Sequence, residues 1–191
     1  PAAELRAGLQ ESIKAGIIYY AKLFRYLEEN ADKVISADPA ALTRVITASV
    51  KVKADVVRKD EKESGLRMIL NFGHTIGHAI EAATHYRKLL HGEAVAWGSI
   101  AALHLSLSRG LITQRDHDRM AALILRYGPI PPFRADPAKL VALTSGDKKR
   151  RSGRRAFVLA TGIGSTEIVY DVTDAELLAA TQSMLADMKQ H

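Results

Sequence analysis

The stretch from Gly65 to Gly98 holds four of the seven histidines of the chain, and its residue types could bind a metal. If residues 67–83 form one helix, its polar side chains recur at intervals of four, three and four residues and share one face. Two neutral imidazoles four residues apart on a helix can offer nitrogen ligands to zinc, although chance also produces this spacing often. The polar residues on this face are Arg67, Asn71, His74 and His78.

A third ligand is needed, because a catalytic zinc takes three protein ligands and leaves one position for water or substrate. The chain contains no cysteine, so the ligands must be His, Asp or Glu, and this composition favours a cytosolic protein. His91 opens the next predicted helix. Glu11, Glu81 and Glu93 all qualify by type as the carboxylate ligand, and their spacing does not distinguish among them.

The opposite side of the predicted helix over residues 67–83 is apolar, so we expect it to pack while the polar face lines a water-filled cleft. Gly73 and Gly77 lie within the same stretch, and glycine lowers helix stability relative to alanine. We therefore expect another backbone or a ligand to approach closely there. The apolar residues are Ile69, Phe72, Ile76 and Ile80.

The remaining elements predict a mainly α fold with one small β-hairpin near residues 155–172, in a single domain over residues 1–191. Helices are predicted over residues 3–30 with a break at Gly16, after Asp38, from His91, over 113–127, after Asp136 and over 171–190. Residues 156–159 and 167–172 are the predicted strands. The charged run 58–65 predicts a solvated turn, from which Asp60 and Glu63 could instead line a site.

Two further histidines lie outside the candidate site. His104 falls in an apolar helical run and is predicted to be hydrogen-bonded rather than a ligand, whereas His117 is predicted to face solvent.

The net charge of +6 favours an anionic partner, such as a phosphorylated small molecule or a nucleic acid. Six of the eight residues from Lys148 to Arg155 are basic, which fits a solvated loop, an anion-binding loop or a nucleic-acid contact. No apolar run approaches the length of a membrane span, and the sequence starts without Met or a signal peptide. This start suggests a cut from a longer chain or a processed form.

Three segments, in order along nearly the whole sequence, resemble the 3-dehydroquinate synthase family. KADVVRKDEKESGLRMILNFGHTIGHAIE followed by HGEAVAWG resembles its signature region. RAGLQESIKAGII resembles the segment that carries its metal-binding glutamate, and DKKRRSGRRAFVLATGIG extends the likeness. Ala15 and Ser99 depart from the family's more usual aromatic residue and Met.

The resemblance implies a role for individual residues. Glu11, His74 and His91 correspond to the ligands of Zn2+ or Co2+, which makes His78 a substrate-site and catalytic residue. Asp60 and Glu63 fall at acidic positions near the nicotinamide or in the hydrogen-bond network of the site. The positions that correspond to substrate-binding residues are Lys14, Lys53, Arg67, Asn71, His78 and the pair Lys148 and Lys149, and Lys14, Arg67 and Asn71 also carry catalytic roles.

The resemblance further implies that this chain is the C-terminal metal- and substrate-binding domain and that the family's N-terminal NAD-binding α/β domain is absent. No G-x-G-x-x-G unit occurs in the sequence. The complete enzyme would use NAD to convert 3-deoxy-D-arabino-heptulosonate 7-phosphate into 3-dehydroquinate and phosphate, in the shikimate pathway. It would be a cytoplasmic homodimer with no nucleic-acid or membrane partner, and the isolated chain would be inactive.

Three alternatives remain open. A sister sugar-phosphate cyclase would make a different carbocycle, and a metal-dependent polyol dehydrogenase would need no phosphate-binding residues. A basic helical nucleic-acid module would bind DNA or RNA with a steep salt dependence.

Overall fold

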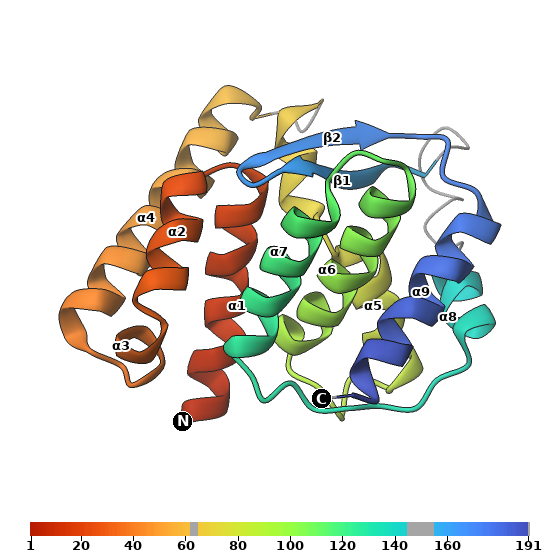
Figure 1. Cartoon of the computed structure of the whole chain (residues 1–191), viewed down its shortest axis with the longest axis horizontal. Coiled ribbons are helices and arrows are strands. Elements are labelled where there is room, and N and C mark those ends of the chain that lie inside the picture. The colour runs from red at the N-terminus through yellow and green to blue at the C-terminus, as the bar shows by residue number, and fades with distance from the viewer. Residues whose placement is uncertain (62–64, 145–154, 191) are drawn as a thin grey trace.

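The computed structural model describes residues 1–61, 65–144 and 155–190, which fold as packed helices with one hairpin (Figure 1). A long first helix and its neighbours form one side of the molecule, and the C-terminal helix lies at the other side. The elements in order are α1 (Ala2–Ile18), α2 (Ala21–Glu29), α3 (Ala31–Ile35), α4 (Pro39–Lys59), the 3-10 helix η1 (Leu66–Asn71), α5 (His74–Ala83), α6 (His91–Ser108), α7 (Gln114–Arg126), α8 (Pro137–Thr144), β1 (Phe157–Gly162), β2 (Ser165–Val169) and α9 (Asp174–Met188).

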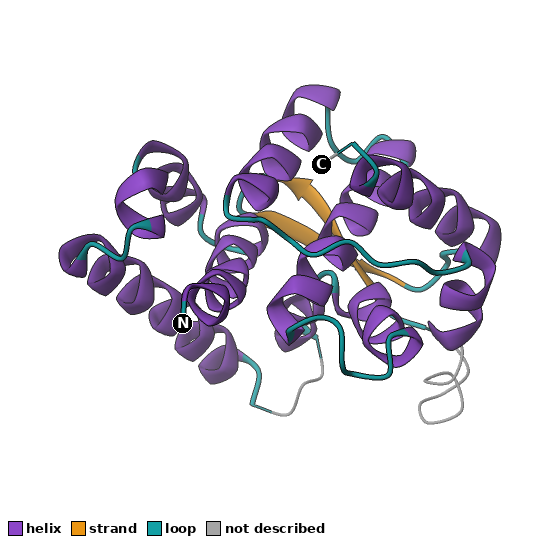
Figure 2. Ribbon diagram, turned by 90° about the horizontal axis from the view of Figure 1, so that it is seen from below, coloured by secondary structure: helices purple, strands orange, loops and turns teal. Residues whose placement is uncertain are grey.

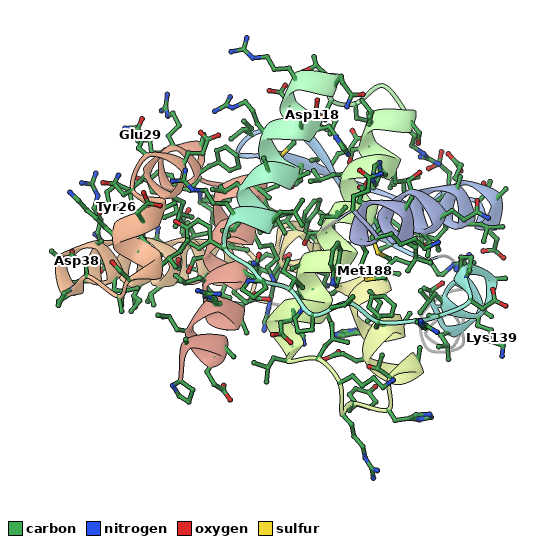
Figure 3. All side chains as sticks on the ribbon, turned by 60° about the horizontal axis from the view of Figure 1, so that its bottom comes forward. Tyr26, Glu29, Asp38, Asp118, Lys139 and Met188 are labelled. Atoms are coloured by element: carbon green, nitrogen blue, oxygen red, sulfur yellow. The ribbon has the colours of Figure 1, made fainter. Side chains whose placement is uncertain are left out.

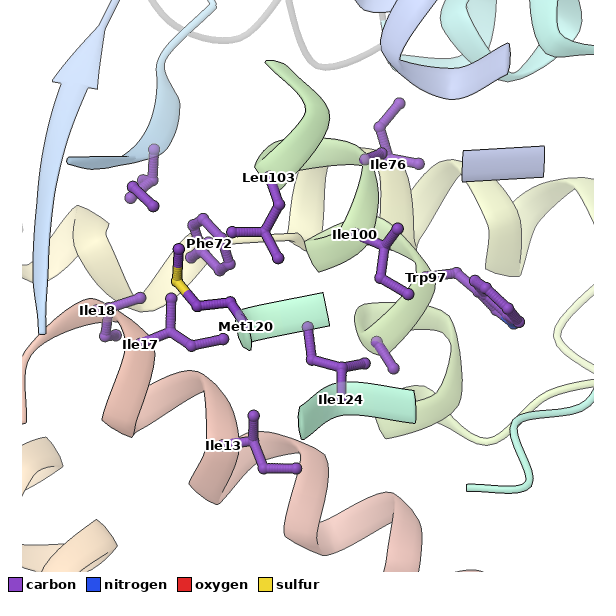
Figure 4. Packing of buried hydrophobic residues seen from close by; sticks show 14 of the residues in the cluster. Ile13, Ile17, Ile18, Phe72, Ile76, Trp97, Ile100, Leu103, Met120 and Ile124 are labelled. Carbon is purple, nitrogen blue, oxygen red and sulfur yellow. The ribbon is translucent and has the colours of Figure 1, made fainter. Parts of the chain in front are cut away.

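Helix α6 forms the centre of the hydrophobic core. Its side chains are buried on nearly all sides because α1, α5, α7, α9 and β1 pack around it. Figure 4 shows Trp97, Ile100 and Leu103 of this helix among apolar side chains from α1, α5 and α7. The predicted mainly α fold is confirmed, and the start of α6 at His91 is also as predicted.

Polar side chains cap several helices where the sequence predicts a start. The Asp38 carboxylate accepts a hydrogen bond from the Ala41 amide at 2.8 Å, at the first turn of α4. Thr113 caps α7 in the same way, and Thr173 forms a reciprocal capping box with Glu176 at the start of α9. These caps supply acceptors for backbone amides that have no partner inside the helix.

The prediction of one helix over residues 67–83 is wrong. The 3-10 helix η1 ends at Asn71, and α5 begins at His74 after Gly73, whose φ of 76° turns the chain. Arg67 and Asn71 therefore do not share a helix face with His74 and His78. The expected close approach at Gly73 is confirmed, because an added Cβ there would lie 2.8 Å from the Ser99 backbone nitrogen.

The first helical region breaks later than predicted. The chain turns at Tyr19 and Tyr20, between α1 and α2, and not at Gly16. Gly16 is needed for a different reason: an added Cβ would lie 2.9 Å from the backbone nitrogen of Phe24, so the absent side chain lets α2 fold back onto α1.

The predicted hairpin is confirmed, with slightly different strand limits. The strands β1 and β2 are antiparallel, with Phe157 opposite Val169 and Leu159 opposite Glu167. Figures 1 and 2 show the hairpin lying across one end of the central helices. The Gly164 amide donates to the Ile17 carbonyl at 2.8 Å, which attaches the hairpin to the end of α1.

Charged side chains cover the outside of the molecule (Figure 3). Glu29 and Lys139 are among those that project from its surface. Among the described residues, no helix combines the length and the apolar character that crossing a membrane requires.

Candidate metal centre

Three side chains from separate elements converge at one point. Glu11 lies in α1, His74 is the first residue of α5, and His91 is the first residue of α6. The Glu11 Oε1 atom lies 4.0 Å from Nε2 of His74 and 3.9 Å from Nε2 of His91. Ligand atoms around a tetrahedral zinc stand about 3.4 Å apart, so this group needs only a small inward movement to hold a cation.

Close backbone packing brings these elements together. An added Cβ on Gly92 would lie 2.0 Å from the Ala7 carbonyl oxygen, so α1 crosses the start of α6 in direct contact. Ala7 is one helical turn before Glu11, and Gly92 follows His91. Helices α5 and α6 touch in a similar way, because an added Cβ on Gly98 would lie 2.0 Å from the Gly73 carbonyl oxygen. The candidate ligand atoms lie close together because the backbones of their helices are in direct contact.

The two oxygens of Glu11 have different surroundings. Oε2 accepts an ion-paired hydrogen bond from Lys14 Nζ at 2.6 Å, whereas Oε1 is buried and has no hydrogen-bond partner among the described residues. Burial acts to raise the pKa of Glu11, but the Lys14 ammonium, together with His74 and His91, outweighs it and holds that pKa below its usual value. A buried carboxylate oxygen that faces two imidazole nitrogens fits a bound cation, because a cation would supply its missing partner.

Each imidazole uses its other nitrogen to contact the protein. Nδ1 of His74 lies 3.1 Å from the Phe72 carbonyl oxygen, and Nδ1 of His91 lies 3.0 Å from Oε1 of Glu81. Burial, assisted by the positive charge of Lys14, lowers the pKa of His74 to about 4. His74 is therefore neutral near pH 7, which is the form that binds metals.

The structure separates the three glutamates that the sequence leaves equivalent. Glu11 faces both imidazoles, while Glu93 accepts a hydrogen bond from the Leu90 amide at 2.7 Å and caps its own helix. Glu81 contacts His91 and belongs to a second group of three possible ligands with His78.

Several residues expected to bind substrate surround this point. Lys14 is buried and also donates to the Leu70 carbonyl at 2.8 Å. Burial is the main cause that lowers the pKa of Lys14, and the positive charge of Lys53 in α4 acts in the same direction. His78 is exposed, one turn beyond His74, with its ring centroid 5.3 Å from that of His74. Lys14 also forms an ion pair with Glu11, three residues earlier on α1, and this pair is partly buried, with 7% and 40% of the two side chains exposed.

Arg67 and Asn71 lie on η1, next to the same end of α5. The Arg67 amide and the Gly65 amide both donate to Oδ2 of Asp60, at 2.9 and 2.8 Å, so this buried carboxylate binds the start of η1. Asn71 is exposed at the end of η1. Three other candidates, Glu63, Lys148 and Lys149, lie outside the described residues.

Of the predictions for the two histidines outside the centre, one is confirmed and the other is wrong. His104 Nε2 lies 2.6 Å from Oδ2 of Asp187, so the predicted hydrogen bond is confirmed. The prediction that His117 faces solvent is wrong: its exposed fraction is 6%, and its ring lies against that of His104, with centroids 4.6 Å apart. The charged residues next to His117 in the sequence suggested an exposed segment, but His117 itself lies on the buried side of α7.

Residues 8–150 match the family model described as 3-dehydroquinate synthase C-terminal. The 3-dehydroquinate synthase of Solibacter usitatus is 46% identical over 187 residues, which cover 97% of this chain and 52% of that protein. The 3-dehydroquinate synthase of Acidithiobacillus ferrooxidans is 47% identical over 193 residues, which cover 99% of this chain and 51% of that protein. The chain thus spans about half the length of the curated relatives that it matches.

Solved structures of related synthases share the fold. A 2-epi-5-epi-valiolone synthase from Streptomyces hygroscopicus, with NAD+ and Zn2+ bound, superposes with a TM-score of 0.88 and 28% sequence identity, over 97% of this chain and 52% of that chain. A 2-deoxy-scyllo-inosose synthase superposes with a TM-score of 0.81 at 23% identity, over 96% of this chain and 52% of that chain, and at this identity the likeness concerns the fold alone.

Proposed function

Since the chain belongs to the 3-dehydroquinate synthase family, we propose that its 191 residues form one domain that binds the metal and the substrate of such an enzyme. The complete enzyme would convert 3-deoxy-D-arabino-heptulosonate 7-phosphate into 3-dehydroquinate and phosphate, a step toward the aromatic amino acids. One observation carries the proposal: His74 and His91 face a Glu11 oxygen that has no hydrogen-bond partner in the part of the chain that the structure describes.

The proposed metal is Zn2+ or Co2+, held by the carboxylate of Glu11 and by Nε2 of His74 and His91. When bound, the metal supplies Lewis acidity at the substrate oxygens, and NAD supplies the hydride acceptor. The family's NAD-binding half would contribute NAD from outside these 191 residues. Lys14 keeps one Glu11 oxygen occupied through its 2.6 Å ion pair, which leaves the other oxygen for the cation.

The side chains around the metal ligands suit an anionic sugar. Arg67 and Lys53 would bind the carboxylate and phosphate of the substrate, because guanidinium and ammonium groups form charge-assisted hydrogen bonds with both. Asn71 would bind a hydroxyl, with Lys148 or Lys149 as a further cationic group. His78 is exposed beside His74 and would move a proton at an imidazole nitrogen, since such a nitrogen can both accept and donate a proton. Asp60 and Glu63 stay predictions as residues near the nicotinamide.

The proposal includes a homodimer in the cytoplasm, which light scattering of the complete enzyme and cell fractionation would test.

The family match favours this synthase over a polyol dehydrogenase. If Arg67 binds an anionic group of the substrate, Arg67→Gln should weaken substrate binding. If the complete enzyme is instead a polyol dehydrogenase, the same change should leave its substrate affinity unchanged.

Metal binding by the purified chain tests the proposal directly. We expect one equivalent of Co2+ per chain by equilibrium dialysis, with Glu11→Gln and His74→Ala each weakening binding by at least about a hundredfold. Glu29→Gln changes an exposed glutamate on α2 and should leave the affinity unchanged. Circular dichroism checks that each variant is folded. Unchanged Co2+ affinity in folded Glu11→Gln and His74→Ala would contradict the assigned ligands.

A second candidate function is a sister sugar-phosphate cyclase, which the likeness to the 2-epi-5-epi-valiolone synthase favours. Mass analysis of the product of the complete enzyme separates the two. A product other than 3-dehydroquinate would support the sister cyclase.

A further inference from the structure

The imidazole of His91 contacts the carboxylate of Glu81 on the neighbouring helix. As the first residue of α6 it is half exposed, with 50% of its side chain accessible, so packing alone does not fix the imidazole ring. Glu81 lies on α5 with only 12% of its side chain accessible, and its Oε1 is 3.0 Å from Nδ1 of His91. The more buried Glu81 side chain is therefore placed to fix the orientation of the more exposed His91 ring.

The hydrogen bond also selects one tautomer of His91. An ionised carboxylate only accepts hydrogen bonds, so Nδ1 of His91 must carry the proton that it donates to Glu81. The lone pair then lies on Nε2, which faces Glu11 Oε1 at 3.9 Å. His74 has the same pattern, because a carbonyl oxygen also only accepts, and Phe72 is 3.1 Å from its Nδ1. Both imidazoles thus direct Nε2 toward one carboxylate oxygen.

Glu81 could instead be a ligand of a second cation, together with His78 and His91. A cation bound at the nitrogen that faces Glu81 would replace the Nδ1 proton of His91. If Nε2 of the same ring also bound a metal, His91 would have lost its one N–H proton and would be a bridging imidazolate. A single cation with Glu81 as a hydrogen-bond acceptor needs no such step.

We infer that Glu81 is the positioning residue of His91, fixing its ring and its tautomer so that Nε2 is available to the metal. This inference rests on the proposed function, because the metal site is part of that proposal. Carboxylates that accept from a metal-binding imidazole also increase its basicity, and replacing them lowers metal affinity.

Nitrogen NMR of the metal-free chain tests the tautomer. With imidazoles labelled with nitrogen-15, we expect His91 to be protonated at Nδ1 in the unaltered chain above neutral pH. Glu81→Ala should reduce the Nδ1-protonated fraction of His91 and leave His74 unchanged. Glu81→Gln should keep the tautomer, because an amide oxygen also accepts a hydrogen bond. A His91 protonated at Nε2 in the unaltered chain would overturn the inference.

Co2+ titration measures the consequence for the metal. We expect Glu81→Ala to weaken Co2+ binding by about 10- to 100-fold and to change the visible Co2+ spectrum, and Glu81→Gln to cause a smaller loss. Glu4→Gln replaces an exposed glutamate of α1 and serves as the control. A binding stoichiometry of two that falls to one in Glu81→Ala would show a ligand role and overturn the inference.

The outcomes also distinguish this inference from the proposed function. Co2+ binding by the unaltered chain together with an unchanged affinity in folded Glu81→Ala would overturn only the role of Glu81. Failure of the unaltered chain to bind Co2+ would overturn both.

Discussion

At the scale of single residues, Lys14 shows how the site uses a buried charge. Its Nζ bridges the Glu11 carboxylate and the Leu70 carbonyl, at 2.6 and 2.8 Å, and only 6% of the residue is exposed. Burying an ammonium group is costly unless acceptors surround it, and these two acceptors offset that cost. Removing Lys14 would leave the Leu70 carbonyl without this donor and free both oxygens of Glu11. We therefore propose that Lys14 also fixes the position of the Glu11 carboxylate, besides the roles that the family resemblance implies.

A second ion pair, remote from the site, gives a pH-dependent stability. Arg109, followed by the Thr173 cap, lowers the pKa of Glu176 from its usual 4.5 to about 2. The unfolded chain therefore binds more protons between these values, so this stabilisation is complete above pH 4.5 and is lost as the pH falls toward 2. We expect Glu176→Gln to flatten the pH dependence of unfolding in this window and to lower the midpoint at pH 7 by about 2–4 °C.

Thermal unfolding at a series of pH values measures this effect, and Glu29→Gln is the control on a distant helix. A Glu176→Gln variant with the same acid dependence as the unaltered chain would contradict the assignment.

At the scale of elements, the crossing of α1 and α6 matters most to the candidate metal centre. The crossing puts Ala7 against Gly92, one turn from Glu11 and one residue from His91. The turn at Gly73 then starts α5 beside α6, with His74 as its first residue. Three helix segments thus each place one candidate ligand at the same point, so side-chain rotation would have to move the ligand atoms only a short distance.

Gly92→Ala tests this crossing. The added Cβ would lie 2.0 Å from the Ala7 carbonyl oxygen, so the helices must separate. We expect a loss of about 2–4 kcal/mol in the free energy of unfolding, together with weaker Co2+ binding. Gly8→Ala is the matched control in α1, since an added Cβ there meets nothing within 4 Å. It should raise helix stability by about 0.5–1 kcal/mol.

Urea unfolding measures both variants. Equal stabilities for Gly92→Ala and the unaltered chain would mean that the crossing tolerates a side chain.

At the scale of the whole molecule, the candidate centre opens at the surface. The side chains of Glu11 and His91 are 40% and 50% exposed, and His78 is exposed beside them. The chain spans about half the length of its curated relatives. On the proposed function, NAD and further enclosure of the substrate come from the half that these residues do not span.

We therefore expect the 191-residue chain alone to release no phosphate from 3-deoxy-D-arabino-heptulosonate 7-phosphate in the presence of NAD and Co2+. A phosphate assay measures this, with the Solibacter usitatus relative as the positive control. Phosphate release by the chain alone at a comparable rate would contradict the proposed division of labour.

Much of the fold could be predicted from local patterns. The starts of α4 and α6 follow from Asp38 and His91, and the hairpin follows from Gly162 and Gly164 between two short apolar runs. The single helix over residues 67–83 was predicted wrongly because periodicity does not reveal a φ of 76° at Gly73. The prediction that His117 faces solvent was wrong because its sequence neighbours are charged, although its own side chain lies on the buried side of α7.

From its residues alone, the sequence established a helical chain with imidazoles and carboxylates suited to a metal, and its likeness to a family singled out one ligand set. Spacing along a helix reports only neighbours within a few residues, because it describes one face of one element. Glu11 and His91 are 80 positions apart, and they meet through a backbone contact between two helices. Which glutamate faces both imidazoles, and which supports one of them from behind, therefore depends on how the helices pack.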